Sequence, residues 1–591
     1  MHFEWVKQAA GFLSPVFANQ LADTEAFDGS INAVKQVAII GAGAAGASTA
    51  YHLHKFAAAE GIELNVTIFE KTSHIGGRSL TVNAYDDPLQ PVELGASIFV
   101  EVNHILWNAT NDFNLTRVDP GADEKGTLAI WDGYSFVYEQ DSDSWGWWNL
   151  AKLFWKYGTA PYYTDKLVKQ VINTFLKLYE RPYFPFRSLS TRAFELGLTA
   201  ITGVTGEQFL AQNKLGGAFA HDIVQAASRV NYASNLAYIH GVGAMVSMAP
   251  EGAVSVLGGN WQMFARMVES SQAHVQLDTA VTSIAEVKSK DPLAPASRFS
   301  ITSSSKRGGS EVVTKHPFAF DNVVIAAPYQ FSGIKTEDNL IQHPIDEIPY
   351  VKLHVTLFAS PFRFSPEFFN LPAGTKTPTA VLTTLAEGED PKSGSEGAGH
   401  SGFYSASLVK VVTNPKTENK EFVYKIFSPA AVTPEFLSKL LGVTIPETFT
   451  GAVPSSSENA SSGDADGEST VVEPISWYHP AVFHPYPQKL PRVTFQDPIL
   501  RDGLYYTSGI ESFISTMETS ALMGMNVARL IVDDLASSAP VASISDDEDI
   551  VVVEVPAAAV AEDTKVEEVT EAVPATSEIS LSEETVPNVE L

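Results

Sequence analysis

The sequence contains no cysteine. Disulfide bonds, thiolate metal ligands and redox-active dithiols are therefore excluded, because each of them needs cysteine sulfur. The absence does not decide the compartment, since secreted proteins can also lack cysteine. The sequence also lacks any stretch that reaches the roughly 18 consecutive apolar residues of a membrane-spanning helix.

Positive charge is scarce as well. Lys and Arg number 39 against 69 Asp and Glu, which gives a formal net charge of −30. Nucleic-acid partners need a basic surface, so this balance argues against them. Part of the charge is local, because residues 541–591 hold fourteen acidic residues and one lysine, −13 of the −30. With few large apolar side chains, residues 536–591 are predicted to form an acidic disordered tail.

The remainder of the 591 residues has a globular composition, with 45% hydrophobic and 10% aromatic residues over the whole chain. Residues 1–34 are interpreted as a leader or loose N-terminal extension. Lys7, a short apolar run and Val16-Phe17-Ala18 make a poor signal-peptide candidate there. The glycosylation sequons are no more frequent than chance allows; they stand at Asn65, Asn108, Asn114 and Asn459.

From Val34 onward the pattern follows the β-α-β order of a dinucleotide fold, with a strand over 37–40, an Ala-rich helix and a strand over 64–70. Gly41-Ala-Gly43-Ala-Ala-Gly46, with Ala45 in the same turn, joins the first strand to the helix. The first glycine permits the tight turn, the second lets backbone approach a pyrophosphate, and the third allows helix and strand to pack closely. The positive end of the helix then faces the phosphates.

Glu70 ends the second strand, 24 residues after Gly46. A carboxylate there can accept a hydrogen bond from a ribose hydroxyl and would repel a 2′-phosphate, which disfavours NADP. NAD and FAD both fit this far.

Gly76-Gly77-Arg78 looks like the extension seen in flavoenzymes of the amine-oxidase and glutathione-reductase kind, where the glycines approach the cofactor and the arginine pairs with phosphate. The segment Glu93–Ser97 and the strand and turn over Phe320–Pro328 support the same resemblance. We therefore expect FAD as the cofactor and assign no metal site. The expected cofactor-binding residues in the first two of these regions are Gly76, Gly77, Arg78, Gly95, Ala96 and Ser97, and Val281 is expected at the cofactor as well.

Near the C-terminal end stands Gly503-Leu-Tyr-Tyr-Thr-Ser-Gly509-Ile510-Glu511. A capping box from Ser515 to Glu518 and a helix to about residue 535 are predicted after it. The helix start would place positive potential near a flavin, which stabilises the negative charge of the reduced ring. Gly509, Ile510 and Glu511 are therefore expected at the cofactor, although an ordinary strand-turn-helix would have the same pattern.

Three segments are more specific: Arg229-Val-Asn-Tyr232, Gly243-Ala-Met-Val-Ser-Met-Ala249 and Gly258-Gly-Asn260. In this order, and with the segment Tyr505–Ala521, they resemble the prenylcysteine oxidase (prenylcysteine lyase) family over roughly residues 35–535. Departures are Met245, where the family has valine, and Ala233-Ser234 in place of Gly-Gln. Two loops rich in Gly, Ser and acid, 387–402 and 454–468, are interpreted as insertions.

The resemblance implies an α/β fold, namely an FAD-binding Rossmann-type fold of the glutathione-reductase and amine-oxidase kind with an intertwined substrate domain of mixed sheet and helices. Residues 35–535 would form this oxidoreductase. Its FAD-binding part is expected at about 35–110, 258–330 and 500–535, and its substrate part at about 111–257 and 331–499.

The resemblance also implies the reaction: farnesyl- or geranylgeranyl-cysteine, oxygen and water give cysteine, a prenyl aldehyde and hydrogen peroxide, by hydride transfer to flavin. Another flavin oxidase, for an amine or polyene, or a non-catalytic FAD and prenyl-lipid binding protein stay open. The catalytic residues are unknown; Glu511 is a weak candidate and could instead bond a ribityl hydroxyl. His104 and His240 are assigned no role.

Residues 145–186 are dense in aromatic side chains at partly helical spacing. They could line the long apolar pocket that a prenyl tail needs, pack as core helices, or rest on a membrane surface as a peripheral contact. The acidic balance weighs against the last. The family resemblance and the weak N-terminal signal favour the secretory pathway, with the vacuole, the lysosome or secretion as destination, while a cytoplasmic location stays open.

Overall fold

The computed structural model describes residues 34–120, 126–141, 146–249, 252–287, 298–307, 310–446 and 473–538. The predicted leader up to residue 33, the loop 454–468 and the acidic tail beyond residue 538 lie outside these ranges and stay predictions. Within the described ranges, no helix combines the length and the apolar character that crossing a membrane requires.

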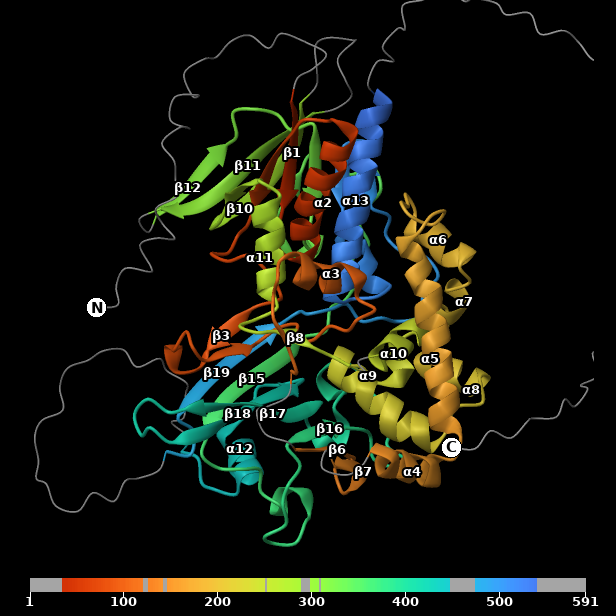
Figure 1. Cartoon of the computed structure of the whole chain (residues 1–591), viewed down its shortest axis with the longest axis vertical. Coiled ribbons are helices and arrows are strands. Elements are labelled where there is room, and N and C mark those ends of the chain that lie inside the picture. Colours follow the sequence, from red (N-terminus) through yellow and green to blue (C-terminus); the bar gives the residue numbers. More distant parts are fainter. Residues whose placement is uncertain are drawn as a thin grey trace, which may run out of the picture. The chain divides into compact units, whose positions relative to one another are not determined.

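A six-stranded sheet in the order β20-β21-β13-β1-β2-β9 forms the first layer (Figure 1). Its central strands read VAII, VTIF and NVVI, apolar runs typical of a parallel sheet that is covered on both faces. β1 pairs in parallel with β2 and with β13, while β20 alone among these strands runs antiparallel. The strand bounds are β1 Lys35–Ile40, β2 Leu64–Phe69, β9 His274–Gln276, β13 Asn322–Ile325, β20 Ile499–Arg501 and β21 Leu504–Tyr506.

The second sheet has the order β12-β11-β10-β14. Its strands are β10 Thr279–Val287, β11 Arg298–Arg307, β12 Ser310–Lys315 and β14 Lys335–Thr336. Residues 275–287 look like one strand-like stretch in the sequence, but they divide into β9 of the first sheet and β10 of the second. The turn between them includes Asp278 with a φ of +50°, which ends a strand. The apolar alternation carries through the turn and conceals it.

The third sheet is mixed and seven-stranded, in the order β19-β15-β18-β17-β16-β6-β7. β16 and β6 pair in parallel, whereas the other neighbours are antiparallel. Its strands are β6 Thr127–Trp131, β7 Phe136–Asp141, β15 Leu353–Ser360, β16 Ala380–Thr383, β17 Ser405–Thr413, β18 Lys420–Ser428 and β19 Trp477–Phe483. Two short pairs complete the strands, β3 Thr81–Asn83 with β4 Pro91–Glu93 and β5 Arg117–Val118 with β8 Ser255–Val256.

The helices gather beside the first sheet and beside the third (Figure 1). Their bounds are α2 Ala44–Glu60, α3 His104–Asp112, α4 Gly146–Tyr157, α5 Ala160–Leu176, α6 Leu189–Glu195, α7 Thr199–Thr202, α8 Gly206–Gln212, α9 Gln225–Tyr232, α10 Gly241–Ser247, α11 Trp261–Ser270, α12 Pro434–Leu441 and α13 Met517–Ser538. With the β1-α2-β2 crossover and the mixed third sheet, they confirm the predicted α/β class.

Helices α2 and α13 lie side by side because small residues face each other (Figure 1). A Cβ added at Gly524 would lie 2.2 Å from the carbonyl oxygen of Ala45, so only glycine lets the two backbones come this close. The Ser48 hydroxyl donates to the Ala521 carbonyl at 2.6 Å across the same contact. The contact holds the C-terminal segment against the glycine turn at the start of α2.

Candidate functional site

The glycine turn is fixed by local sterics. Gly41 has a φ of +106°, and a Cβ there would lie 2.9 Å from the carbonyl oxygen of Ala326, which follows β13. A Cβ at Gly46 would lie 1.9 Å from the carbonyl oxygen of Gly41. Any side chain at either position would therefore separate β1, α2 and β13, which the turn joins.

Gly43 has a different environment from its neighbours. A Cβ there would touch only the edge of the Gly76-Gly77 turn, 3.7 Å from the Cα of Gly77, so a side chain would extend from the turn without breaking it. The backbones of Gly43 and Gly76 pair as a parallel bridge, and the Gly76 amide donates to the Ala42 carbonyl at 2.9 Å.

The N-terminus of α2 behind this turn is electrostatically uncompensated. Gly43 is its N-cap, no side chain caps it, and its first turn holds no acidic residue. Its first amides therefore keep N–H groups for an anion, and the helix dipole favours one there. Together with the backbone that Gly43 leaves uncovered, this fits the pyrophosphate of a dinucleotide.

Glu70 lies just beyond the end of β2 and is buried. Its Oε2 accepts from the Ala42 amide at 2.8 Å, and its Oε1 accepts from the amide and hydroxyl of Thr72, each at 2.8 Å. Because a carboxylate oxygen can accept two bonds, Oε2 keeps capacity for one more donor, such as a ribose hydroxyl. Val281 is buried on β10 and belongs to the same apolar cluster as Ile40 and Phe69.

The segment 93–97 passes under the Gly76–Arg78 turn. A Cβ at Gly95 would lie 1.7 Å from the Arg78 carbonyl oxygen, and the Ala96 amide donates to that oxygen at 3.1 Å. The buried Lys425 on β18 donates from Nζ to the Ser97 hydroxyl at 2.8 Å and to the Glu93 carbonyl at 2.9 Å. Burial lowers the pKa of the Lys425 ammonium below its ordinary value.

Asn260 ties this segment to α11. Its backbone amide donates to a carboxylate oxygen of Glu93 at 2.6 Å, and its side-chain amide donates to the Ala96 carbonyl at 3.1 Å. Gly259, just before it, has a φ of +122°, a conformation that favours glycine. The Gly-Gly-Asn motif therefore holds the segment that includes Gly95, Ala96 and Ser97.

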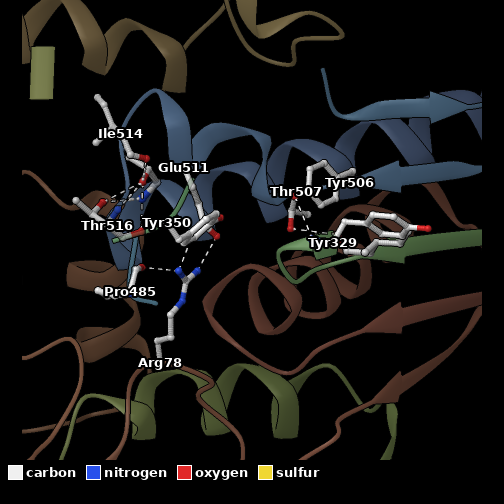
Figure 2. A network of polar contacts seen from close by, with 11 residues as sticks. Arg78, Tyr329, Tyr350, Pro485, Tyr506, Thr507, Glu511, Ile514 and Thr516 are labelled. Atoms are coloured by element: carbon white, nitrogen blue, oxygen red, sulfur yellow. Dashed lines mark hydrogen bonds and ion pairs between the residues drawn. The ribbon is translucent and has the colours of Figure 1, made fainter. Parts of the chain in front are cut away.

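An ion pair joins the Arg78 turn to the C-terminal segment (Figure 2). The Arg78 guanidinium donates to both carboxylate oxygens of Glu511, at 2.6 and 2.9 Å, and to the Pro485 carbonyl at 2.5 Å. The Tyr350 hydroxyl donates to Glu511 at 3.1 Å. Burial alone would lower the pKa of Arg78, but the Glu511 carboxylate raises it above its ordinary value.

Glu511 belongs to the one-turn helix Ser508–Ser512, which is buried throughout. Gly509 is required there, because a Cβ would lie 2.5 Å from the Gln496 carbonyl oxygen. Ile510 is buried in the same core cluster as α2 and α13. The fold therefore brings Arg78 and Glu511 into one site over a separation of 433 residues.

The predicted capping box from Ser515 to Glu518 is wrong by one residue. Thr516 and Thr519 cap α13 reciprocally, each hydroxyl accepting from the other residue's amide at 3.0 to 3.1 Å. Glu518 instead accepts from the amides of Ile105 and Leu106 at 2.9 and 3.0 Å, and so caps α3. Its partner helix is distant in sequence, so the local pattern could not identify it. Burial raises the pKa of Glu518 to about 7.

The two histidines without an assigned role differ. The buried His240 is the N-cap of α10: its Nδ1 accepts from the Gly243 amide at 3.0 Å, and its Nε2 lies 3.2 Å from the Ser512 carbonyl. Burial lowers the pKa of His240 to about 3, so a neutral ring joins α10 to the Glu511 segment. The ring of His104 packs edge-on against Tyr179, with centroids 5.5 Å apart.

Lys489 was not anticipated from the sequence. Its Nζ is buried, has no hydrogen-bond partner within the described ranges, and lies 3.6 Å from the ring centroid of Tyr232 and 5.0 Å from that of Tyr486. Burial lowers the pKa of Lys489 well below its ordinary value. A lysine in a loop is usually exposed, so no local signal distinguished it.

Arg229, the first residue of the Arg-x-Asn-Tyr motif, is completely buried. Its guanidinium donates to the Thr383 hydroxyl on β16 and to the carbonyls of Gly397 and Ala398, at 2.7 to 3.1 Å. The loop 387–402, interpreted as a low-complexity insertion, is therefore bound to α9 as part of the structure.

The family model described as prenylcysteine lyase matches residues 140–544, more than half of the chain. The chain belongs to the prenylcysteine lyase family. A second model, described as an NAD(P)-binding Rossmann-like domain, matches residues 39–113, which contain the glycine turn. This member of the prenylcysteine lyase family is thus an oxidoreductase built on a dinucleotide-binding domain.

Relatives extend over most of the chain. A farnesylcysteine lyase of Arabidopsis thaliana is 26% identical over 520 residues, 84% of this chain and 88% of that protein. Prenylcysteine oxidase 1 of Bos taurus is 28% identical over 516 residues, with the same shares covered. Among solved structures, a cyclohexylamine oxidase from Brevibacterium oxydans has a TM-score of 0.49 and 15% identity, covering 85% of this chain and 100% of that one. A structural likeness this low carries no conclusion about substrate.

Proposed function

We propose that this chain is an FAD-dependent thioether oxidase of prenylcysteine. The overall reaction converts farnesyl- or geranylgeranyl-cysteine, oxygen and water into cysteine, the prenyl aldehyde and hydrogen peroxide. Membership of the prenylcysteine lyase family carries this proposal. It is supported by relatives whose names state a farnesylcysteine or prenylcysteine substrate, at 26% and 28% identity.

FAD fits the residues present. The uncapped N-terminus of α2 and the backbone at Gly43 would hold the pyrophosphate, and the remaining acceptor position on Glu70 would hold a ribose hydroxyl. The segments that include Arg78, Ser97 and Glu511 would lie beside the rest of the cofactor. Bound FAD would supply the hydride acceptor and pass the electrons to oxygen.

The chemistry needs orientation more than acid or base. Loss of hydride from prenyl C1 leaves a cation stabilised by the adjacent sulfur and by the allylic double bond. Water adds to that carbon, and the resulting hemithioacetal breaks its C–S bond to give aldehyde and thiol. The protein would contribute by binding the substrate in one orientation, with prenyl C1 next to the hydride acceptor.

The contacts of Glu511 suit this side chain to holding neighbouring segments of the chain in place. Its Oε2 accepts from both Arg78 and Tyr350, and its Oε1 accepts from Arg78. Both carboxylate oxygens are thus occupied by donors of the chain itself, and those from the guanidinium are charged hydrogen bonds. We infer that the Arg78–Glu511 pair holds the turn at Gly76 and the helical turn at Gly509 in one arrangement around the flavin.

The test combines substrate and cofactor. The purified protein should carry FAD, and anaerobic mixing with farnesylcysteine should bleach the visible flavin absorbance. With oxygen and water present, the prenyl aldehyde, free cysteine and peroxide should appear in equal amounts. Deuterium at prenyl C1 should slow the bleaching, because hydride transfer breaks that C–H bond.

A matched pair of glycine variants distinguishes loss of the cofactor from loss of the fold. Gly43→Val should keep the fold and lose FAD, because its side chain extends toward the phosphate position without a close contact. Gly61→Asn at the other end of α2 should keep both the fold and FAD, since asparagine tolerates the left-handed conformation there.

Bleaching of the flavin by a simple amine but not by farnesylcysteine would contradict the proposed thioether reaction and would indicate amine oxidation instead.

A further inference from the structure

Large aromatic side chains face outward at the corner where α4 meets α5. Trp155 is 91% exposed, Tyr162 57%, Tyr163 51% and Phe154 39%. These four residues, which we call the aromatic corner, lie on either side of the turn at Gly158. Tyr157 and Phe175 of the same helices are buried, so these two aromatic residues pack in the core while the four of the corner do not.

The charge of this corner is opposite to that of the chain. Residues 146–176 contain four lysines and one aspartate, a net charge of +3 in a chain of −30. Lys156 pairs with Asp222, and Lys169 with Asp165. Lys152 and Lys166 are exposed beside the aromatic side chains.

Local charge decides adsorption to a membrane. At physiological ionic strength the screening length is about 8 Å, so acidic groups farther from the contact have little effect. Lysine beside tryptophan and tyrosine is the combination that favours the interface of an anionic bilayer. The overall acidity of the chain therefore does not exclude binding at this corner.

We propose that the aromatic corner, with Lys152 and Lys166, docks the protein on an anionic membrane surface. Figure 1 shows α4 and the adjoining end of α5 at the edge of the described structure, far from β1 and α2. Docking here leaves the glycine turn clear of the bilayer. The inference goes beyond the proposed function and does not rest on it, because membrane binding can be measured without turnover.

Helix α5 leads from this surface toward the candidate site. Tyr162 and Phe175 lie about 20 Å apart along the helix at 1.5 Å per residue. The ring of Phe175 is 6.2 Å from that of Phe513, two residues beyond Glu511. A membrane-dissolved substrate with a prenyl tail would thus meet the protein at the corner from which α5 runs to the site.

The experiment is flotation of the full-length protein with vesicles of phosphatidylcholine alone and with about one third phosphatidylserine. The protein should float with the anionic vesicles. Lys152→Ala and Lys166→Ala should each lower partitioning onto anionic vesicles about fivefold and leave neutral vesicles unaffected. Trp155→Ala should lower partitioning at least about tenfold, since a large apolar side chain no longer enters the interface.

Control variants on the second sheet match these changes. Phe318→Ala and Lys315→Ala alter an exposed aromatic residue and an exposed lysine near β12, and both should float like the parent. All variants should retain the parent melting temperature, because the altered side chains are exposed.

Failure of the parent to float with either vesicle would overturn the proposal. Equal flotation of Trp155→Ala and the parent would overturn it too. A parent that dimerises through the corner and loses the dimer in Trp155→Ala, without vesicle binding, would make the corner a protein interface instead. None of these results depends on whether farnesylcysteine is the substrate.

Discussion

The Arg78–Glu511 pair offers the sharpest test of the site. Glu511→Gln keeps the shape of the side chain and removes the charge that Arg78 faces. The side chain of Glu511 is 3% exposed and that of Arg78 36%. Removing one partner of a fully buried pair costs about 3–5 kcal/mol, and solvent at the arginine reduces this. We expect a loss of about 2–3 kcal/mol in the free energy of unfolding.

A double-mutant cycle isolates the pair. Arg78→Met leaves the Glu511 carboxylate with Tyr350 as its remaining side-chain donor among the described residues. If the two groups stabilise each other, the double variant should be more stable than the sum of the single losses predicts, by about 1–3 kcal/mol. Tyr350→Phe, which removes one hydrogen bond to a charged group, should cost about 1.5 kcal/mol.

The assay is urea unfolding of each variant, followed by far-UV circular dichroism, with flavin content measured on the same samples. The pair links the Gly76 turn to the Gly509 turn, so we expect the variants to lose flavin as well as stability. Additive single effects, with full flavin content in Glu511→Gln, would refute the positioning role inferred for this pair.

Three further changes test the structure. Gly524→Leu should push α13 from Ala45, cost at least about 3 kcal/mol and release the cofactor, seen as a lower melting temperature and less bound flavin; a variant that melts like the parent contradicts this packing. Burial raises the pKa of Glu518 from 4.5 to about 7, so the folded state binds the extra proton between these values and the unfolding free energy should fall as pH rises through them. Glu518→Gln should flatten that fall in urea titrations at several pH values; an unchanged slope assigns the dependence to another group. Burial lowers the pKa of Lys489, so between that lowered value and lysine's ordinary pKa the unfolded chain binds more protons than the folded chain, and the unfolding free energy should rise with pH. Lys489→Met should remove that rise in urea titrations at several pH values; a variant that keeps the slope would assign it to another group.

Much of the glycine turn could be predicted from the local sequence. The requirement for glycine at positions 41 and 46 arises from a backbone angle and from contacts within the same turn and its neighbouring strand. Such sterics recur wherever a strand turns tightly into a helix, so the spacing of the motif predicts the structure. The strand β13 and the Gly509 segment were likewise predicted from short patterns.

Other features depend on which distant segments meet. Glu518 follows a helix-start pattern and yet caps α3, because the fold brings the amides of Ile105 and Leu106 to its carboxylate. The division of residues 275–287 between two sheets depends on which strands stand beside each half, and apolar alternation is the same in either sheet.

The sequence by itself determined the β-α-β unit, the glycine turn and the family, because backbone sterics and ordered motifs are properties of short segments. The tertiary structure alone decided that Arg78 faces Glu511 across 433 residues, and that Lys489 is buried between tyrosine rings. It also decided that Trp155 faces outward. Ion pairs and burial depend on the partners that folding brings together, and hydrophobicity along the chain does not specify those partners.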